Sequence, residues 1–169
     1  TGVNDAPGAS DDSAIIAENQ SINSASLDNE IDVDNGAVLS VDSASSTRVF
    51  TTTASTTVST LANPDFLSFS QGDTTTETIS YTAKDEYGAT DTASIDTTIT
   101  GVNDAPVAID DSAIIAENQS INIASLNNDI DVDNGAVLSV DSASSTRGLT
   151  TTDGNTVTFS ANTDFDYLA

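Results

Sequence analysis

The feature that most constrains this fold is a seven-residue connector that occurs twice. Residues 1–7 read TGVNDAP, and residues 100–106 repeat those letters without a change. Residue n aligns with residue n + 99 without a gap over the first 70 positions, and only five of the first 48 positions differ. A fixed period of this length is typical of tandem domains, each of which buries its own core. We therefore expect an array of repeats.

Alternation of apolar and polar residues predicts that each repeat is built from strands. Ile79, Tyr81 and Ala83 alternate with Ser and Thr, and a second run carries Ile95 and Ile99 on one side. Threonine, which favours strands, is abundant, and no segment has helical spacing with caps over three turns. Glycine-containing turn signals separate the runs, at residues 34–36, 71–73, 87–88 and 153–155. These signals predict an all-β fold, an antiparallel β-sandwich of about seven strands per repeat.

The two repeats differ in how much of this sandwich they contain. We expect residues 1–99 to form a complete sandwich, with residues 1–7 as its joint segment and residues 100–106 as the joint between the repeats. Residues 107–169 form a second repeat that is truncated before its last two strands, because nothing aligns with the runs at about 74–84 and 88–99. Such a unit exposes core face and strand edges. Either the chain is a fragment of a longer protein, or another copy supplies the strands.

The charge of the chain excludes several classes of partner. Three Lys and Arg residues stand against 27 Asp and Glu, a net charge of −24. A chain this acidic repels nucleic acid and anionic membrane surfaces, and it has no apolar run long enough to insert into a membrane. It also repels itself unless cations neutralise the carboxylates. Calcium or a high salt concentration would do so.

Residues that usually carry catalysis are missing. The chain has no Cys and no His, which removes disulfides, thiolate metal sites and the commonest general base. It also lacks phosphate loops, zinc motifs and nucleophile elbows. The aromatic residues occur in strand-like context, which favours core positions over an aromatic-lined catalytic cleft: Phe66, Phe69, Tyr81 and Phe165. Arg48 and Arg147 are isolated cations for which a local salt bridge is the simplest role. We expect no enzyme.

An acidic turn is the strongest candidate for a functional site. Residues 32–36 read DVDNG, and residues 131–135 repeat this sequence. Carboxylates at i and i+2 before an Asn-Gly turn suit calcium, which takes six to eight oxygen ligands. An EF-hand is excluded, because Ser43 stands where the twelfth-position Glu belongs. Acidic turns on a solvated surface are the plain alternative, but acid–amide pairs at residues 18–19 and 103–104 strengthen the calcium interpretation.

Three segments carry a resemblance to a known family. Residues 17–19 (AEN), 102–106 (VNDAP) and 131–133 (DVD) resemble the three calcium motifs of cadherin repeats. The whole unit more closely resembles the cadherin-like and VCBS-type repeats of giant bacterial RTX adhesins, and this resemblance covers essentially the full chain. It implies tandem Ig-like or cadherin-like sandwiches with calcium at their joints. Gly101 and Ala105 depart from the cadherin joint, which leaves the number of ligands and ions open.

The resemblance also implies which residues bind calcium. At the joint between the repeats the implied ligands are Glu18, Asp73, Asn103, Asp104, Asp131 and Asp133. At the preceding joint they are Asn4, Asp5, Asp32, Asp34 and Asp85. Glu117 would serve the following joint. Asp73 and Asp85 rest on approximate spacing, and the pair at residues 110–111 (with its copy at 11–12) is a further candidate.

These inferences lead to one hypothesis and two alternatives. The hypothesis is a non-catalytic, calcium-stiffened extender repeat of a secreted bacterial surface adhesin that serves cell adhesion and biofilm formation. Its partners would be neighbouring repeats of the same chain, its cofactor Ca²⁺, and its location extracellular, after type I secretion of the parent protein. The first alternative is a calcium-dependent carbohydrate-binding module, and the second is a halophilic surface protein tuned to salt. The near-identity of the copies favours a spacer, because a spacer gains from length.

Overall fold

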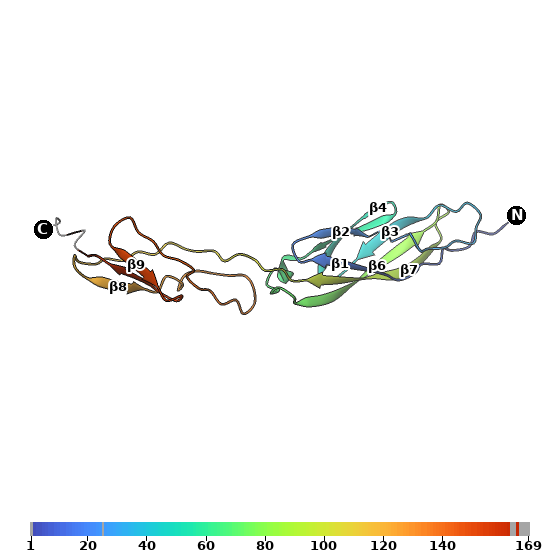
Figure 1. Cartoon of the computed structure of the whole chain (residues 1–169). Coiled ribbons are helices and arrows are strands. Elements are labelled where there is room, and N and C mark those ends of the chain that lie inside the picture. Colours follow the sequence, from blue (N-terminus) through green and yellow to red (C-terminus); the bar gives the residue numbers. More distant parts are fainter. Residues whose placement is uncertain (1, 25, 163–164, 166–169) are drawn as a thin grey trace. The chain divides into compact units, whose positions relative to one another are not determined.

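Figure 1 shows the computed structural model of the chain, which describes residues 2–24, 26–162 and 165. The chain divides into two compact units, Thr1–Asn103 and Asp104–Ala169. Strands dominate both units, and the described residues include one short 3-10 turn, η1 (Pro64–Phe66). In this described part, no helix has the length and apolar character needed to cross a membrane.

The first unit is a sandwich of two sheets. One sheet has four strands in the order β1-β7-β6-β3, and the other has three in the order β2-β5-β4. The strands are β1 (Asp12–Ala17), β2 (Ser21–Ser24), β3 (Ser40–Ser45), β4 (Val49–Ala54), β5 (Thr57–Ala62), β6 (Thr74–Lys84) and β7 (Thr90–Thr100). The predicted all-β sandwich is confirmed. One pair departs from the predicted antiparallel arrangement, because β1 runs parallel to β7, from Asp12 opposite Ile95 to Ala17 opposite Thr100.

The long β6–β7 hairpin is the centre of the first unit. Its strands pair antiparallel along their whole length, from Thr74 opposite Thr100 to Lys84 opposite Thr90. Gly88 closes the hairpin with a φ of 92°, a conformation that glycine adopts without strain. The predicted alternation is confirmed, because the inward side chains of both strands are buried. They are Ile79, Tyr81, Ala83, Ile95 and Ile99.

The core lies between this hairpin and the second sheet. Val58 of β5 and Phe66 of η1 are fully buried in it. The guanidinium of Arg48 lies 4.6 Å from the centre of the Phe66 ring. Its Nη1 atom is also 2.7 Å from Oε1 of Glu77 on β6. The local salt bridge predicted for Arg48 is therefore present, and it satisfies a carboxylate that is itself buried.

Among its described residues, the second unit forms only one of the two sheets. Its described strands pair in the order β8-β10-β9 and correspond to β2, β5 and β4 of the first unit. Their bounds are β8 (Ser120–Ile123), β9 (Leu149–Thr152) and β10 (Val157–Ser160). The other sheet of the first unit is built on β6 and β7, and no residue of the second unit aligns with either strand. Arg147 keeps the place of Arg48, 4.6 Å above the ring of Phe165.

Candidate metal centres

Polar side chains from three loops meet at one end of the first unit. Nδ2 of Asn4 donates a hydrogen bond to Oδ2 of Asp85 at 2.8 Å. The backbone N–H of Asp5 donates to Oδ2 of Asp34 at 2.9 Å, and the N–H of Asp34 donates to Oδ1 of Asp32 at 2.8 Å. The structure thus joins the five residues assigned to the preceding joint into two hydrogen-bonded groups.

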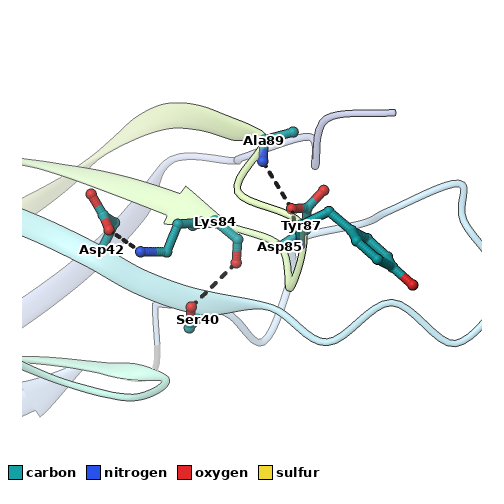
Figure 2. Close-up of polar contacts among 6 residues, drawn as sticks. All are labelled: Ser40, Asp42, Lys84, Asp85, Tyr87 and Ala89. Atoms are coloured by element: carbon teal, nitrogen blue, oxygen red, sulfur yellow. Dashed lines mark hydrogen bonds and ion pairs between the residues drawn. The ribbon is translucent and has the colours of Figure 1, made fainter. Parts of the chain in front are cut away.

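Asp85 holds the β6–β7 turn together. Its Oδ1 accepts the backbone N–H groups of Tyr87 and Ala89, each at 2.9 Å, and Figure 2 shows the contact with Ala89. Burial disfavours the charged form of this carboxyl, but the hydrogen bonds from Asn4 and from the turn outweigh it and hold the pKa below its usual range. Asp85 is therefore ionised at neutral pH, and most of its bonding capacity closes the turn.

A hollow of about 410 Å³ lies at this end of the unit. Its lining combines the connector, the acidic turn and the β6–β7 turn: Gly2, Val3, Asn4, Asp34, Asn35, Glu86 and Tyr87. The sequence analysis missed Glu86 and Tyr87, although both follow Asp85 in a glycine-containing turn. Oε2 of Glu86 accepts the N–H of Val38 at 2.9 Å. Tyr87 is 77% exposed, and its ring points away from the other labelled side chains in Figure 2.

One oxygen of this acidic turn has no donor. Oδ2 of Asp32 is buried, and no described residue forms a hydrogen bond with it. A carboxylate oxygen removed from water without a partner is costly, and a cation would remove that cost. Carboxylate and amide oxygens are the ligands that calcium prefers. The donor set of Asn4, Asp32 and Asp34 therefore fits a calcium ion.

Glu18 occupies the other end of β1, beside the connector. Its backbone N–H donates to the carbonyl of Thr100 at 3.0 Å, and its Oε1 accepts the N–H of Val102 at 2.8 Å. The side chain is 1% exposed, and Oε2 is buried with no hydrogen-bond partner in the described part of the chain. Glu18 thus ties the start of the connector to the first unit, and its second carboxylate oxygen has the character of a cation ligand.

Asp73 lies near the same stretch of the connector but is used differently. Its carbonyl accepts the N–H of Gly101 at 2.8 Å, so Asp73 and Glu18 are both tied to adjacent connector residues. Its Oδ2, however, accepts the N–H of Ser70 at 3.1 Å and so closes its own turn. The exposed carboxylate of Asp73 is a weaker candidate than that of Glu18.

The second unit repeats the acidic turn of the first. The N–H of Asp104 donates to Oδ2 of Asp133 at 3.0 Å, and the N–H of Asp133 donates to Oδ1 of Asp131 at 2.9 Å. Asp133 is 9% exposed, and its Oδ1 is buried without a hydrogen-bond partner among the residues described. Each copy of the turn therefore has a buried carboxylate oxygen without a hydrogen-bond partner among the described residues, but at different positions: on Asp32 in the first copy, and in the second on Asp133, the counterpart of Asp34. These residues fit calcium for the reason given for the first unit.

Two other predicted ligands are exposed in the structure. Asn103 is exposed at the end of the first unit. Glu117 is also exposed, whereas its counterpart Glu18 is buried. Glu18 is held in place by the hydrogen bond that it accepts from the N–H of Val102.

A second acidic group, which the sequence analysis only touched on, lies within the first unit. The hydroxyl of Tyr81 contacts Oε1 of Glu30 and lies 2.8 Å from the carbonyl of Ser10. Burial and the neighbouring Glu30 raise the pKa of Tyr81, and the same two causes raise the pKa of Asp12. Oδ1 of Asp11 accepts the N–H and hydroxyl of Ser94 at 2.9 Å. The pair at residues 11–12 is thus tied to the sheet.

Comparison with known proteins gives one family. Residues 4–98 and residues 103–168 each match the sequence model of a family described as Bacterial Ig domain. Together the two matches cover nearly the whole chain, and they fall on either side of residues 99–102. No curated protein matches the chain in sequence.

The depressed pKa of Asp85 predicts how stability depends on pH. A carboxyl whose pKa is lower in the folded state stabilises the fold above its unfolded pKa, roughly 3.9, and this contribution is lost as the pH falls through the folded value. In chelator at neutral pH, Asp85→Asn should therefore lower the Tm. The difference in Tm between this variant and the unchanged protein should become smaller below about pH 4.

The control is Asp65→Asn, which removes an exposed carboxylate elsewhere in the first unit. Tm would be measured by circular dichroism from pH 2 to pH 7. A gap between the Asp85 variant and the unchanged protein that is the same at every pH would contradict this role of the Asp85 charge.

Proposed function

The chain belongs to the bacterial Ig domain family, and from that premise we propose that it is a calcium-stiffened, non-catalytic extender segment of a secreted cell-surface adhesin. Domains of this family are generally structural repeats outside the cell and are not enzymes. The proposal adds three points to that statement: calcium as the cofactor, stiffening of the connector as the mechanism, and adhesion as the role of the parent protein.

The repeated acidic turn carries the proposal. In each copy an Asp-x-Asp turn accepts the N–H of the connector aspartate, at 2.9 Å from Asp5 and 3.0 Å from Asp104. In each copy one carboxylate oxygen of the turn is buried without a hydrogen-bond partner in the described residues, in Asp32 and in Asp133. Ordinary solvated turns expose their carboxylates to water. Buried oxygens at the same loop of both copies support a bound cation.

The connector would be stiffened by its ties to both units. On the side of the first unit, Glu18 accepts the N–H of Val102. On the side of the second unit, Asp104 donates to Asp133. The ligands proposed for the ion at this connector are Glu18, Asn103, Asp104, Asp131 and Asp133, with Asp73 as a weaker candidate. Calcium supplies positive charge for the facing carboxylates, and because it binds only the folded arrangement, it also stabilises that arrangement.

The wider role follows from the repetition. The near-identity of the first 48 positions of the two copies suits a spacer, whose value grows with the number of units. We include in the proposal the cadherin-like and VCBS-type repeats of RTX adhesins as the closer relatives, with type I secretion of the parent protein and a role in biofilm formation. The net charge of −24 suits a segment exposed to external calcium.

One observation favours a second candidate, a carbohydrate-binding module. Tyr87 is exposed beside the acidic hollow of the first unit, and an exposed aromatic ring next to polar groups is suited to a sugar face. Under this alternative, Tyr87→Ala should abolish binding to polysaccharides in a pull-down, while Phe50→Ala, which removes another exposed ring, should not. If the unchanged protein retains no polysaccharide with calcium present, the alternative is wrong.

The calcium proposal predicts a specific loss in the Asp133→Ala variant. This substitution removes the buried carboxylate of the second acidic turn, and it should weaken calcium binding by at least about tenfold, the low end of what even supporting residues of metal sites contribute. Isothermal titration calorimetry on the full chain would measure the affinity. Asp141→Ala is the matched control, because it removes the same charge from an exposed position of the same unit. Equal loss in both variants would mean that bulk charge alone attracts the ion.

A further inference from the structure

The acidic turn of each unit contains an asparagine followed by a glycine, a pair that supplies none of the proposed calcium ligands. In the first unit the N–H of Ala37 donates to the carbonyl of Asp34 at 3.3 Å, which closes a tight turn with Asn35 and Gly36 at its centre. The second unit repeats this closure over residues 133–136, at 3.2 Å. The same sequence thus forms the same turn in both units, and the surroundings of this turn determine the chemistry open to the asparagine.

Asn35 is open to water and to the main-chain nitrogen that follows it. Its side chain is exposed and lines the hollow at the end of the first unit. Gly36 has a φ of 87°, and a Cβ atom added to it would meet nothing within 4 Å, so the space around this nitrogen is open. The N–H of Gly36 forms no hydrogen bond with any described residue. Neither packing nor hydrogen bonding therefore restrains the nitrogen that could attack the side chain of Asn35.

The turn at residues 153–155 shows the opposite arrangement. Asp153 also precedes a glycine, but the N–H of Gly154 donates to Oγ1 of Thr152 at 3.0 Å. Asn155 is also exposed, but the N–H that follows it, on Thr156, donates to Oδ1 of Asp153 at 2.7 Å. Hydrogen bonds from the N–H groups of Asn155 and Thr156 also hold the pKa of Asp153 below its usual range, so this carboxyl stays ionised and resists attack. Because a bonded N–H must first give up its partner, we expect both side chains to be protected.

We propose that Asn35 is a site of spontaneous covalent modification, at which the side chain is converted through a cyclic imide to aspartate and isoaspartate. The main-chain nitrogen of Gly36 attacks Cγ of Asn35 and forms a bond to it. The bond from Cγ to Nδ2 breaks, and ammonia leaves with the proton of the attacking nitrogen. Water then opens the ring, its hydroxyl going to carbon and its proton to nitrogen. Cleavage between this nitrogen and Cγ gives aspartate, whereas cleavage between it and the main-chain carbonyl carbon gives isoaspartate.

Both products change the acidic turn of the first unit. Each adds a carboxylate beside Asp32 and Asp34, in a chain whose net charge is already −24. Aspartate leaves the length of the main chain unchanged. Isoaspartate inserts a carbon atom into the main chain of residue 35, which enlarges the ring that the hydrogen bond from Ala37 to Asp34 closes. The turn therefore becomes more acidic and looser as the protein ages. The reaction consumes only water, and the inference does not depend on calcium.

Trypsin allows the reactive and the protected turn to be compared within one chain. Cleavage after Arg48 and Arg147 places Asn35 on fragment 1–48 and Asn155 on fragment 148–169. The full chain would be aged in mildly alkaline buffer made with heavy-oxygen water, with its fold followed by circular dichroism, and then digested in ordinary water. By mass spectrometry we expect fragment 1–48 to carry heavy oxygen and to accept methyl groups from a protein isoaspartyl methyltransferase. Fragment 148–169 should do neither, and equal labelling of the two fragments would overturn the argument from the bonded N–H groups.

A matched pair of variants assigns the reaction to one residue of fragment 1–48. Asn35→Gln keeps an amide but requires a larger ring for attack, so this variant should lose most of the isoaspartate of the fragment. Asn23→Gln changes another exposed asparagine of the same fragment and should retain the isoaspartate. Absence of heavy oxygen from fragment 1–48, or isoaspartate that persists in the Asn35→Gln variant, would overturn the proposal. So would heavy oxygen without isoaspartate in the unchanged chain, since the reaction would then not pass through the cyclic imide.

Discussion

The shortage of positively charged side chains determines how the carboxylates of this chain are satisfied. The chain sets 27 carboxylates against three Lys and Arg residues, so ion pairs can satisfy very few of them. Lys84 and Arg48 each pair with one carboxylate of the first unit. Many others depend on N–H groups of turns, as Asp85 does. Where those donors run out, buried oxygens are left without a partner among the described residues, in Asp12, Glu18, Glu30, Asp32 and Asp133. Under the proposal made above, calcium would supply the positive charge that the chain itself lacks at the acidic turns and the connector.

The β6–β7 hairpin is the structural centre of the first unit. It contributes the two middle strands of the larger sheet and much of the core, and it satisfies the edges of β1 and β3. The two repeats allow a direct comparison. Residues 12–17 and 40–45 form β1 and β3 beside the hairpin, whereas the identical sequences at residues 111–116 and 139–144, which have no hairpin beside them, do not belong to strands. Strand formation at these segments is thus decided by long-range pairing, in line with the dependence of β propensity on context.

The sequence predicted the all-β sandwich, the strands β6 and β7 and their buried faces, because strict alternation and glycine turns are local signals. It did not predict that β1 pairs parallel with β7, since the direction of pairing is set by the path of the whole chain. At the end of the first unit that carries the hollow, the sequence singled out Asp32, Asp34 and Asp85 as candidate ligands. It missed Glu86 and Tyr87, because their place in the lining of the hollow depends on packing between loops. The buried state of Glu18 was also beyond a sequence argument, because it arises from a contact with Val102 at a separation of 84 residues.

Thermal unfolding of the whole chain tests the role of calcium most directly. The Tm would be compared in millimolar calcium, in chelator, and in high NaCl with chelator. Specific sites at the acidic turns and the connector predict a large rise in Tm with calcium and little with NaCl, because the doubly charged calcium ion binds a site of several carboxylates far more tightly than sodium does. Equal stabilisation by NaCl and calcium would contradict this account, since the carboxylates would then need only general screening of their charge.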